Sequence, residues 1–194
     1  MTWFLAGLIL FFAVHLLPIM PDLRSGVRDA VGGAAYRGLF SLISLVGLVL
    51  IVIGYGDLRT SVAANPELWS PPTWTRHVAF LLMIPSMILL VSAYVPNRIR
   101  DAVGHPMLAA IKIWAFAHLL ANGDLASVIL FASFLAYAVI DRISVKRRNA
   151  RGPVGDKAGG LSGDVTVVGV GLLAYAAILF FAHEWLIGIP LIAT

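Results

Sequence analysis

Residues 105–143 read HPMLAAIKIWAFAHLLANGDLASVILFASFLAYAVIDRI. The segment holds two apolar runs, and each approaches the roughly 20 residues that a helix needs to cross the hydrocarbon core of a bilayer. The residues that separate the runs, Asn122-Gly123-Asp124, are typical of turns. A connection this short predicts that the two runs form an antiparallel helical hairpin within a membrane.

The same alternation of apolar blocks and polar breaks extends along the whole chain of 194 residues, of which 60% are hydrophobic and 12% are charged. These proportions lie outside the range of ordinary soluble domains. Six blocks approach the length of a membrane span, at approximately residues 2–20, 36–55, 75–95, 105–121, 125–143 and 164–187. The expected fold is all-α, a single integral membrane domain over residues 1–194 that forms a bundle of about six transmembrane helices. The first block has neither a basic segment before it nor a small-residue cleavage pattern after it, so we interpret it as a retained span.

Arginine and lysine accumulate on one side of this topology, as they do in the cytoplasmic loops of membrane proteins. Those that follow spans one, three and five are Arg24, Arg28, Arg37, Arg98, Arg100, Arg142, Lys146, Arg147, Arg148, Arg151 and Lys157. On the opposite side the basic residues are Arg59 and Arg76. Both termini are therefore expected outside the cytoplasm. The net charge of +4 reflects this loop bias and does not indicate nucleic-acid binding.

The connection over residues 142–163 is basic and rich in glycine. We interpret it as a solvated topology determinant beside anionic lipid headgroups. The alternative is a clamp for an anionic group such as a phosphate or a cofactor carboxylate.

Histidines lie within the apolar runs or at their ends. They are His15, His77, His105, His118 and His183. An imidazole in hydrocarbon needs a partner, so ionisable groups in spans mark candidate functional sites. Each alone is usually a hydrogen-bonded packing residue, but several together suit haem, which needs one or two neutral imidazoles in an apolar slot between helices. Trp114 and His118 are four residues apart and share a helix face, so the indole can pack beside whatever the imidazole binds.

The residues required for several other kinds of active site are absent from this sequence. The absence of cysteine excludes disulfides, thiolate nucleophiles and Cys-ligated metals, which leaves nitrogen and oxygen ligands. Metalloprotease, serine-hydrolase and P-loop motifs are also absent from the chain. The spans contain no paired carboxylates, which argues against general acid–base hydrolysis.

The segment GHPMLAAIKIWAFAHLLANGD at residues 104–124, with FFAVH at 11–15 and YRGLFSLISLVGL at 36–48, resembles the NnrU family of membrane proteins. The likeness covers nearly the whole chain. That family is similar to the zeta-carotene isomerases of plants and cyanobacteria, which use haem b to isomerise a central cis double bond of a polyene. Bacterial NnrU proteins are associated with denitrification, as factors needed for nitrite and nitric oxide reductase.

The resemblance implies haem b as the cofactor and His15 and His118 as its axial ligands and catalytic residues. Their estimated depths in the membrane differ, so His77 and His183 remain alternative ligands. Trp114 would pack beside the cofactor. The isomerases have an arginine before the His-Pro pair, where this chain has Gly104. Basic residues elsewhere would then contact the cofactor carboxylates, and the candidates are Arg37, Arg98 and Arg100.

Three functions remain open at this stage. The first is a haem-dependent isomerase or redox role in the bacterial inner membrane, with an apolar polyene as the candidate substrate. The second is a non-catalytic accessory factor whose partner is a respiratory reductase. The third is a membrane methyltransferase, because His105-Pro106 followed by a Trp-containing span also resembles isoprenylcysteine and phospholipid methyltransferases. Those enzymes continue with a Glu pair and a Tyr-rich helix, whereas lysine, arginine and glycine follow Asp141 here.

Overall fold

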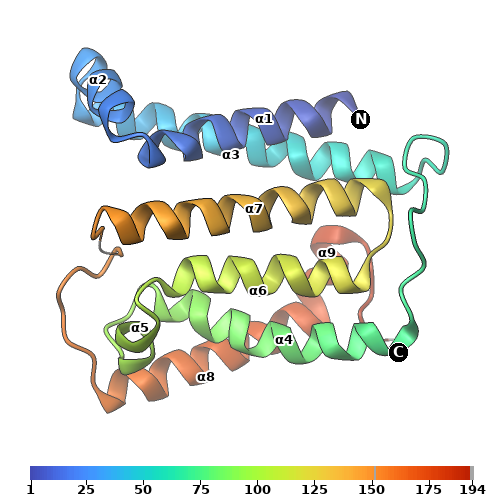
Figure 1. The fold of residues 1–194 in the computed structure, drawn as a ribbon. Coiled ribbons are helices and arrows are strands. Elements are labelled where there is room, and N and C mark those ends of the chain that lie inside the picture. Colours follow the sequence, from blue (N-terminus) through green and yellow to red (C-terminus); the bar gives the residue numbers. More distant parts are fainter. Residues whose placement is uncertain (151, 193–194) are drawn as a thin grey trace. The chain divides into compact units, whose positions relative to one another are not determined.

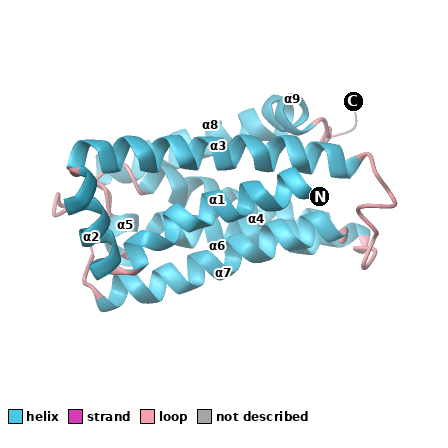
Figure 2. Cartoon of the chain, turned by 90° about the horizontal axis from the view of Figure 1, so that it is seen from above, coloured by secondary structure: helices cyan, strands magenta, loops and turns pink. Residues whose placement is uncertain are grey.

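The computed structural model describes residues 1–150 and 152–192, and within those ranges the secondary structure is helical, without a strand (Figures 1 and 2). The α-helices are α1 (Thr2–Leu16), α2 (Pro21–Val31), α3 (Gly33–Arg59), α4 (Thr73–Ser92), α5 (Arg98–Val103), α6 (Pro106–Ala121), α7 (Leu125–Arg147), α8 (Leu161–Ala177) and α9 (His183–Ile187). A 3-10 turn, η1 (Leu17–Ile19), follows α1, and a π-helical segment, η2 (Ile178–Ala182), joins α8 to α9. The predicted all-α fold is confirmed.

Five of the described helical segments are long and apolar enough to cross a membrane. They are Thr2–Ile19, Gly33–Arg59, Thr73–Ser92, Leu125–Arg147 and Leu161–Ile187. The remaining predicted span corresponds to α6, which is apolar but has only 16 residues. At 1.5 Å per residue α6 is about 24 Å long, which is shorter than the hydrocarbon core of about 30 Å. The protein is therefore a multi-pass membrane protein with five candidate spans among the described residues, and the predicted count of about six is approximate because α6 is short.

Two connections that the hydropathy pattern treats as loops contain helices. Pro21 occupies the first turn of α2, where its missing N–H costs no hydrogen bond. Asn97 is the N-cap of α5, and its side-chain oxygen accepts a hydrogen bond from the Arg100 backbone N–H at 2.7 Å. Both helices are too polar for a hydropathy criterion, which explains why only their capping residues mark them in the sequence.

The chain divides into two compact units, Met1–Leu68 with Asp124–Ala126 and Trp69–Gly123 with the chain from Ser127 onward. In the first unit, α1 and α3 pack along each other (Figure 1). Phe4 lies against Gly54, and Gly7 lies against Gly47. Residue numbers increase along α1 while those of the contacting residues decrease along α3, so the two helices are antiparallel.

Glycines allow this close approach of the two backbones. A Cβ added to Gly7 would lie 2.6 Å from the Ile51 backbone nitrogen, and one added to Gly47 would lie 2.8 Å from that of Phe11. Small residues at such interfaces let membrane helices approach closely enough for dispersion contacts to hold them together.

In the second unit, α4 packs against α6 and α8. The buried hydroxyl of Ser86 donates to the Ala110 carbonyl oxygen of α6 at 2.9 Å. Gly171 of α8 lies against Ile88, and Gly163 lies against Pro96, so α4 and α8 are antiparallel.

The predicted hairpin of α6 and α7 is also present in this unit. His118, near the end of α6, lies against Phe131 near the start of α7. At the opposite ends of the two helices, Arg142 of α7 lies near Gly104 and donates to the Val103 carbonyl oxygen at 3.5 Å. The antiparallel arrangement is confirmed.

Candidate functional site

His118 lies in an aromatic cluster formed by α6 and α7. Its ring centroid is 5.2 Å from that of Trp114 and 4.5 Å from that of Phe131. Trp114 in turn makes edge-to-face contacts with Phe131 and Phe134, at 5.1 and 5.4 Å. The prediction that Trp114 and His118 share a face is confirmed. The imidazole is half-buried beside apolar surfaces that suit a flat aromatic ligand.

The tautomer of His118 follows from its hydrogen bond. The Nδ1 atom lies 2.8 Å from the Trp114 carbonyl oxygen, one helical turn earlier. A carbonyl oxygen accepts hydrogen bonds but cannot donate them, so Nδ1 carries the proton and Nε2 has a lone pair in the neutral ring. Metal-ligating histidines commonly have this arrangement, because the bond from the second nitrogen fixes the tautomer and orients the ring.

His183 repeats this arrangement at the start of α9. Its Nδ1 donates to the Ile189 carbonyl oxygen at 2.9 Å. The chain reaches that position because Gly188 has a positive φ of 74°, which ends α9 and turns the backbone. The π-helical segment just before His183 is a feature often found at functional sites. His118 and His183 lie close enough for their charges to interact.

His15 in the first unit has the same local geometry. Its Nδ1 donates to the Phe11 carbonyl oxygen at 2.7 Å, and its ring stacks on Phe11 with a centroid distance of 4.0 Å. Phe40 of α3 lies on the same cluster at 5.1 Å. In its neutral form, His15 therefore also carries the proton on Nδ1 and has a lone pair on Nε2.

The remaining predicted ligand is His77, and the predicted anion contacts are Arg37, Arg98 and Arg100. His77 is exposed in the second turn of α4, and Arg37 is exposed in the second turn of α3. Arg98 forms an ion pair with Asp164, and its backbone N–H donates to the same carboxylate. The side chain and the backbone N–H of Arg98 therefore both hold the start of α8 against α5.

Arg100 also has protein partners. It pairs with Asp101 at 2.6 Å and donates to the Lys157 carbonyl oxygen. Asp101 accepts from the Gly159 backbone N–H at 3.0 Å. The Arg100 hydrogen bond, followed by that of Gly159, holds the pKa of Asp101 below its usual 3.8. Arg100 thus anchors the loop before α8.

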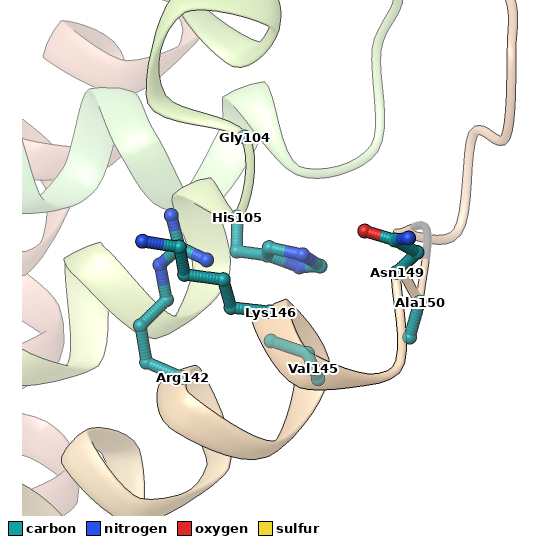
Figure 3. Close-up of a pocket in the computed structure, with 7 residues that line it drawn as sticks. All are labelled: Gly104, His105, Arg142, Val145, Lys146, Asn149 and Ala150. Atoms are coloured by element: carbon teal, nitrogen blue, oxygen red, sulfur yellow. The ribbon is translucent and has the colours of Figure 1, made fainter.

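His105 lies in a pocket of about 400 Å³ at the junction of α6 and α7 (Figure 3). The lining residues are Gly104, His105, Arg142, Val145, Lys146, Asn149 and Ala150. In Figure 3 the His105 ring extends toward Asn149. Burial, and next the nearby Arg142 guanidinium, hold the pKa of His105 below its usual 6.5.

The sequence contained signals for this pocket that hydropathy reasoning missed. Arg142, Val145, Lys146 and Asn149 have the spacing of one helix face. Asn149 has a positive φ of 45° and ends α7, with the Ala150 N–H bonded to the Val145 carbonyl oxygen at 2.9 Å. A basic helix face that ends in such a cap indicates a fixed surface. The prediction of a solvated connection from residue 142 onward is therefore wrong for residues 142–147, which belong to α7.

Within residues 1–150 and 152–192, no group of three or more histidine, aspartate or glutamate side chains could hold a metal ion. A site with three protein ligands is therefore not formed by this part of the chain. Haem requires one or two imidazoles, since the porphyrin supplies the other ligands.

The fold and these sites define the chain as an all-α, multi-pass membrane protein whose imidazoles are oriented by backbone carbonyls. The family model described as NnrU protein matches residues 3–191, and the chain therefore belongs to the NnrU family. No curated protein and no solved structure matches the chain.

Proposed function

We propose that this protein binds haem b through His118 and uses it in an isomerase or redox role. The observation that carries the proposal is the 2.8 Å hydrogen bond from His118 Nδ1 to the Trp114 carbonyl oxygen. It presents an unprotonated Nε2 beside an aromatic cluster, which is the chemistry that iron in a porphyrin requires of a protein ligand.

Two histidines are candidates for the second axial position. His183 is supported by its electrostatic interaction with His118 and by its bond to the Ile189 carbonyl oxygen. His15 is supported by the family resemblance and by its bond to the Phe11 carbonyl oxygen. Either would supply a neutral imidazole with the proton on Nδ1.

The bound haem would supply an iron centre that can change oxidation state and accept a soft ligand such as a polyene double bond. Within the protein, His118 holds the cofactor, and Trp114, Phe131 and Phe134 provide flat apolar surfaces that exclude water and orient an apolar substrate. A neutral His118 whose proton is held on Nδ1 by the Trp114 carbonyl oxygen has no proton to donate from Nε2 and offers a lone pair there.

We further propose an inner-membrane location with both termini outside the cytoplasm, on the basis of the basic residues that follow spans one, three and five. Reporter fusions at the two termini test it. Cytoplasmic activity of either fusion contradicts it.

The experiment for haem is the absorbance spectrum of the detergent-purified protein after expression with added haem precursor. We expect a reducible Soret band with sharp α and β bands. Turnover of a cis polyene by the purified protein then tests the isomerase role. Protein that folds but never acquires the spectrum would instead support the non-catalytic accessory role beside a respiratory reductase.

A further inference from the structure

The pocket around His105 is lined by cationic and polar groups that have no role in the proposed haem ligation. Its cationic lining groups are Arg142 and Lys146, and its polar groups are His105 and the Asn149 amide. None of the lining residues is acidic. With His105 neutral, the lining therefore has a formal charge of two positive units.

Among residues 1–150 and 152–192, neither Arg142 nor Lys146 forms an ion pair with a carboxylate. The nearest acidic residue in sequence, Asp141, pairs instead with Arg148 at 3.7 Å and accepts from Tyr137 at 3.4 Å. The bond from Arg142 to the Val103 carbonyl oxygen, at 3.5 Å, is long and uses one nitrogen of the guanidinium.

The backbone keeps the pocket open and fixed. Gly104 has a positive φ of 77°, and a Cβ at that position would lie 3.7 Å from an Arg142 guanidinium nitrogen. The cap at Asn149 fixes the opposite wall. Backbone geometry therefore sets two walls of the cavity, at Gly104 and at Asn149.

The pocket also lies at the ends of apolar helices, which is where a spanning protein meets the lipid headgroups. It is formed at the end of α7, directly after the apolar part of a membrane-crossing helix, and at His105, directly before the apolar helix α6. Lys146 and Asn149 are exposed there. Cationic side chains at this depth attract anionic lipid, and a guanidinium matches the geometry of a phosphate.

From these observations we infer that the pocket of Gly104, His105, Arg142, Lys146 and Asn149 is a binding site for a phosphate group at the membrane surface. Arg142 and Lys146 hold the anionic oxygens, and the Asn149 amide donates to them. The phosphate belongs either to an anionic phospholipid or to free phosphate in the adjacent water.

The experiment measures binding of three probes to the full-length protein in detergent: phosphatidylglycerol, phosphatidylcholine and inorganic phosphate. Native mass spectrometry gives the lipid affinities, and thermal shift gives the response to phosphate. The variants are Lys146→Gln, Arg142→Gln and the double variant. Arg147→Gln is the matched control, because it removes an exposed charge from the same helix end but does not line the pocket.

We expect phosphatidylglycerol to bind in preference to phosphatidylcholine, and each single variant to lose about fivefold of that preference. The double variant should lose it entirely, while Arg147→Gln keeps most of it. A response to inorganic phosphate that depends on the same residues, without lipid preference, also supports a phosphate site and assigns it to free phosphate. Lys146→Gln, which replaces an exposed cation by a neutral side chain, keeps the test valid if Arg142→Gln does not fold.

Equal binding of all probes by the wild type and the double variant would overturn the inference. So would a double variant that loses its haem spectrum but keeps its lipid preference, because the pocket would then serve the cofactor.

Discussion

The Trp114 carbonyl oxygen accepts the Nδ1 hydrogen of His118 at 2.8 Å, and the two side-chain rings lie 5.2 Å apart. One turn of α6 thus fixes the tautomer of the imidazole and also places an indole beside it. The acceptor is a main-chain atom, so the tautomer does not depend on the identity of residue 114.

The backbone and the side chain of Trp114 thus have different roles, and Trp114→Leu should affect only the role of the side chain. The variant should keep the haem spectrum, because the carbonyl oxygen remains. It should lower the thermal midpoint, because the indole contacts with Phe131 and Phe134 are lost, at a cost of about 1–3 kcal/mol. Absorbance and thermal unfolding of the same sample check both. Loss of the spectrum in a folded variant would show that the indole itself holds the cofactor.

The second axial ligand can be identified by comparing His183→Ala with His15→Ala. His183 lies in the same compact unit as His118 and is oriented by the Ile189 carbonyl oxygen, so we expect His183→Ala to convert the low-spin spectrum to a high-spin one and His15→Ala not to do so. His77→Ala is the control, because that side chain is exposed. The reverse result would assign the position to His15, and unchanged spectra in both variants would exclude ligation by two imidazoles from this set.

The packing of α1 on α3 predicts opposite effects for two neighbouring glycines. A Cβ on Gly54 would overlap the Phe4 backbone, so Gly54→Ala should destabilise the protein by about 1–3 kcal/mol. Gly56 has open space around it on the same helix, so Gly56→Ala should stabilise by up to about 1 kcal/mol. Thermal midpoints in detergent check the pair. Equal midpoints would mean that the two helices do not approach this closely.

His105 predicts a dependence of stability on pH. In the folded protein the pKa of His105 lies below 6.5, mainly because of burial and next because of the Arg142 charge. The Arg148 charge also lowers this pKa, whereas the Asp141 charge raises it. The unfolded state therefore takes up a proton at a higher pH than the folded state, and stability falls as the pH drops below about 6.5. Between about pH 7.5 and about pH 5, the thermal midpoint should fall further in the wild type than in His105→Gln.

The carboxyl of Asp101 does not interfere with that measurement. Its pKa lies below 3.8, so it stays ionised across the range, and its stabilising contribution is lost only at lower pH. Parallel curves for the wild type and His105→Gln would show that His105 has the same proton affinity in the folded and unfolded states.

The fold was largely predictable because apolar blocks of span length leave few alternatives to membrane helices. The hairpin after His118 followed from Asn122-Gly123-Asp124, and the shared face of Trp114 and His118 followed from helical spacing. In contrast, α2 and α5 were missed because polar helices give no hydropathy signal.

The candidate site was less predictable, for physical reasons. The bond from His183 to Ile189 depends on the turn at Gly188, and the partners of Arg98 depend on where α8 begins. Such contacts join residues whose proximity is set by backbone geometry. Sequence spacing therefore indicated which imidazoles lie in the spans but not which neighbours orient them.

The most direct test of haem ligation is the reduced spectrum of His118→Ala beside that of His105→Ala, each in folded, detergent-purified protein. Our account predicts that His118→Ala loses the low-spin bands, that added imidazole restores part of them, and that His105→Ala keeps them. Wild-type bands in His118→Ala, or the same loss in both variants, would contradict it.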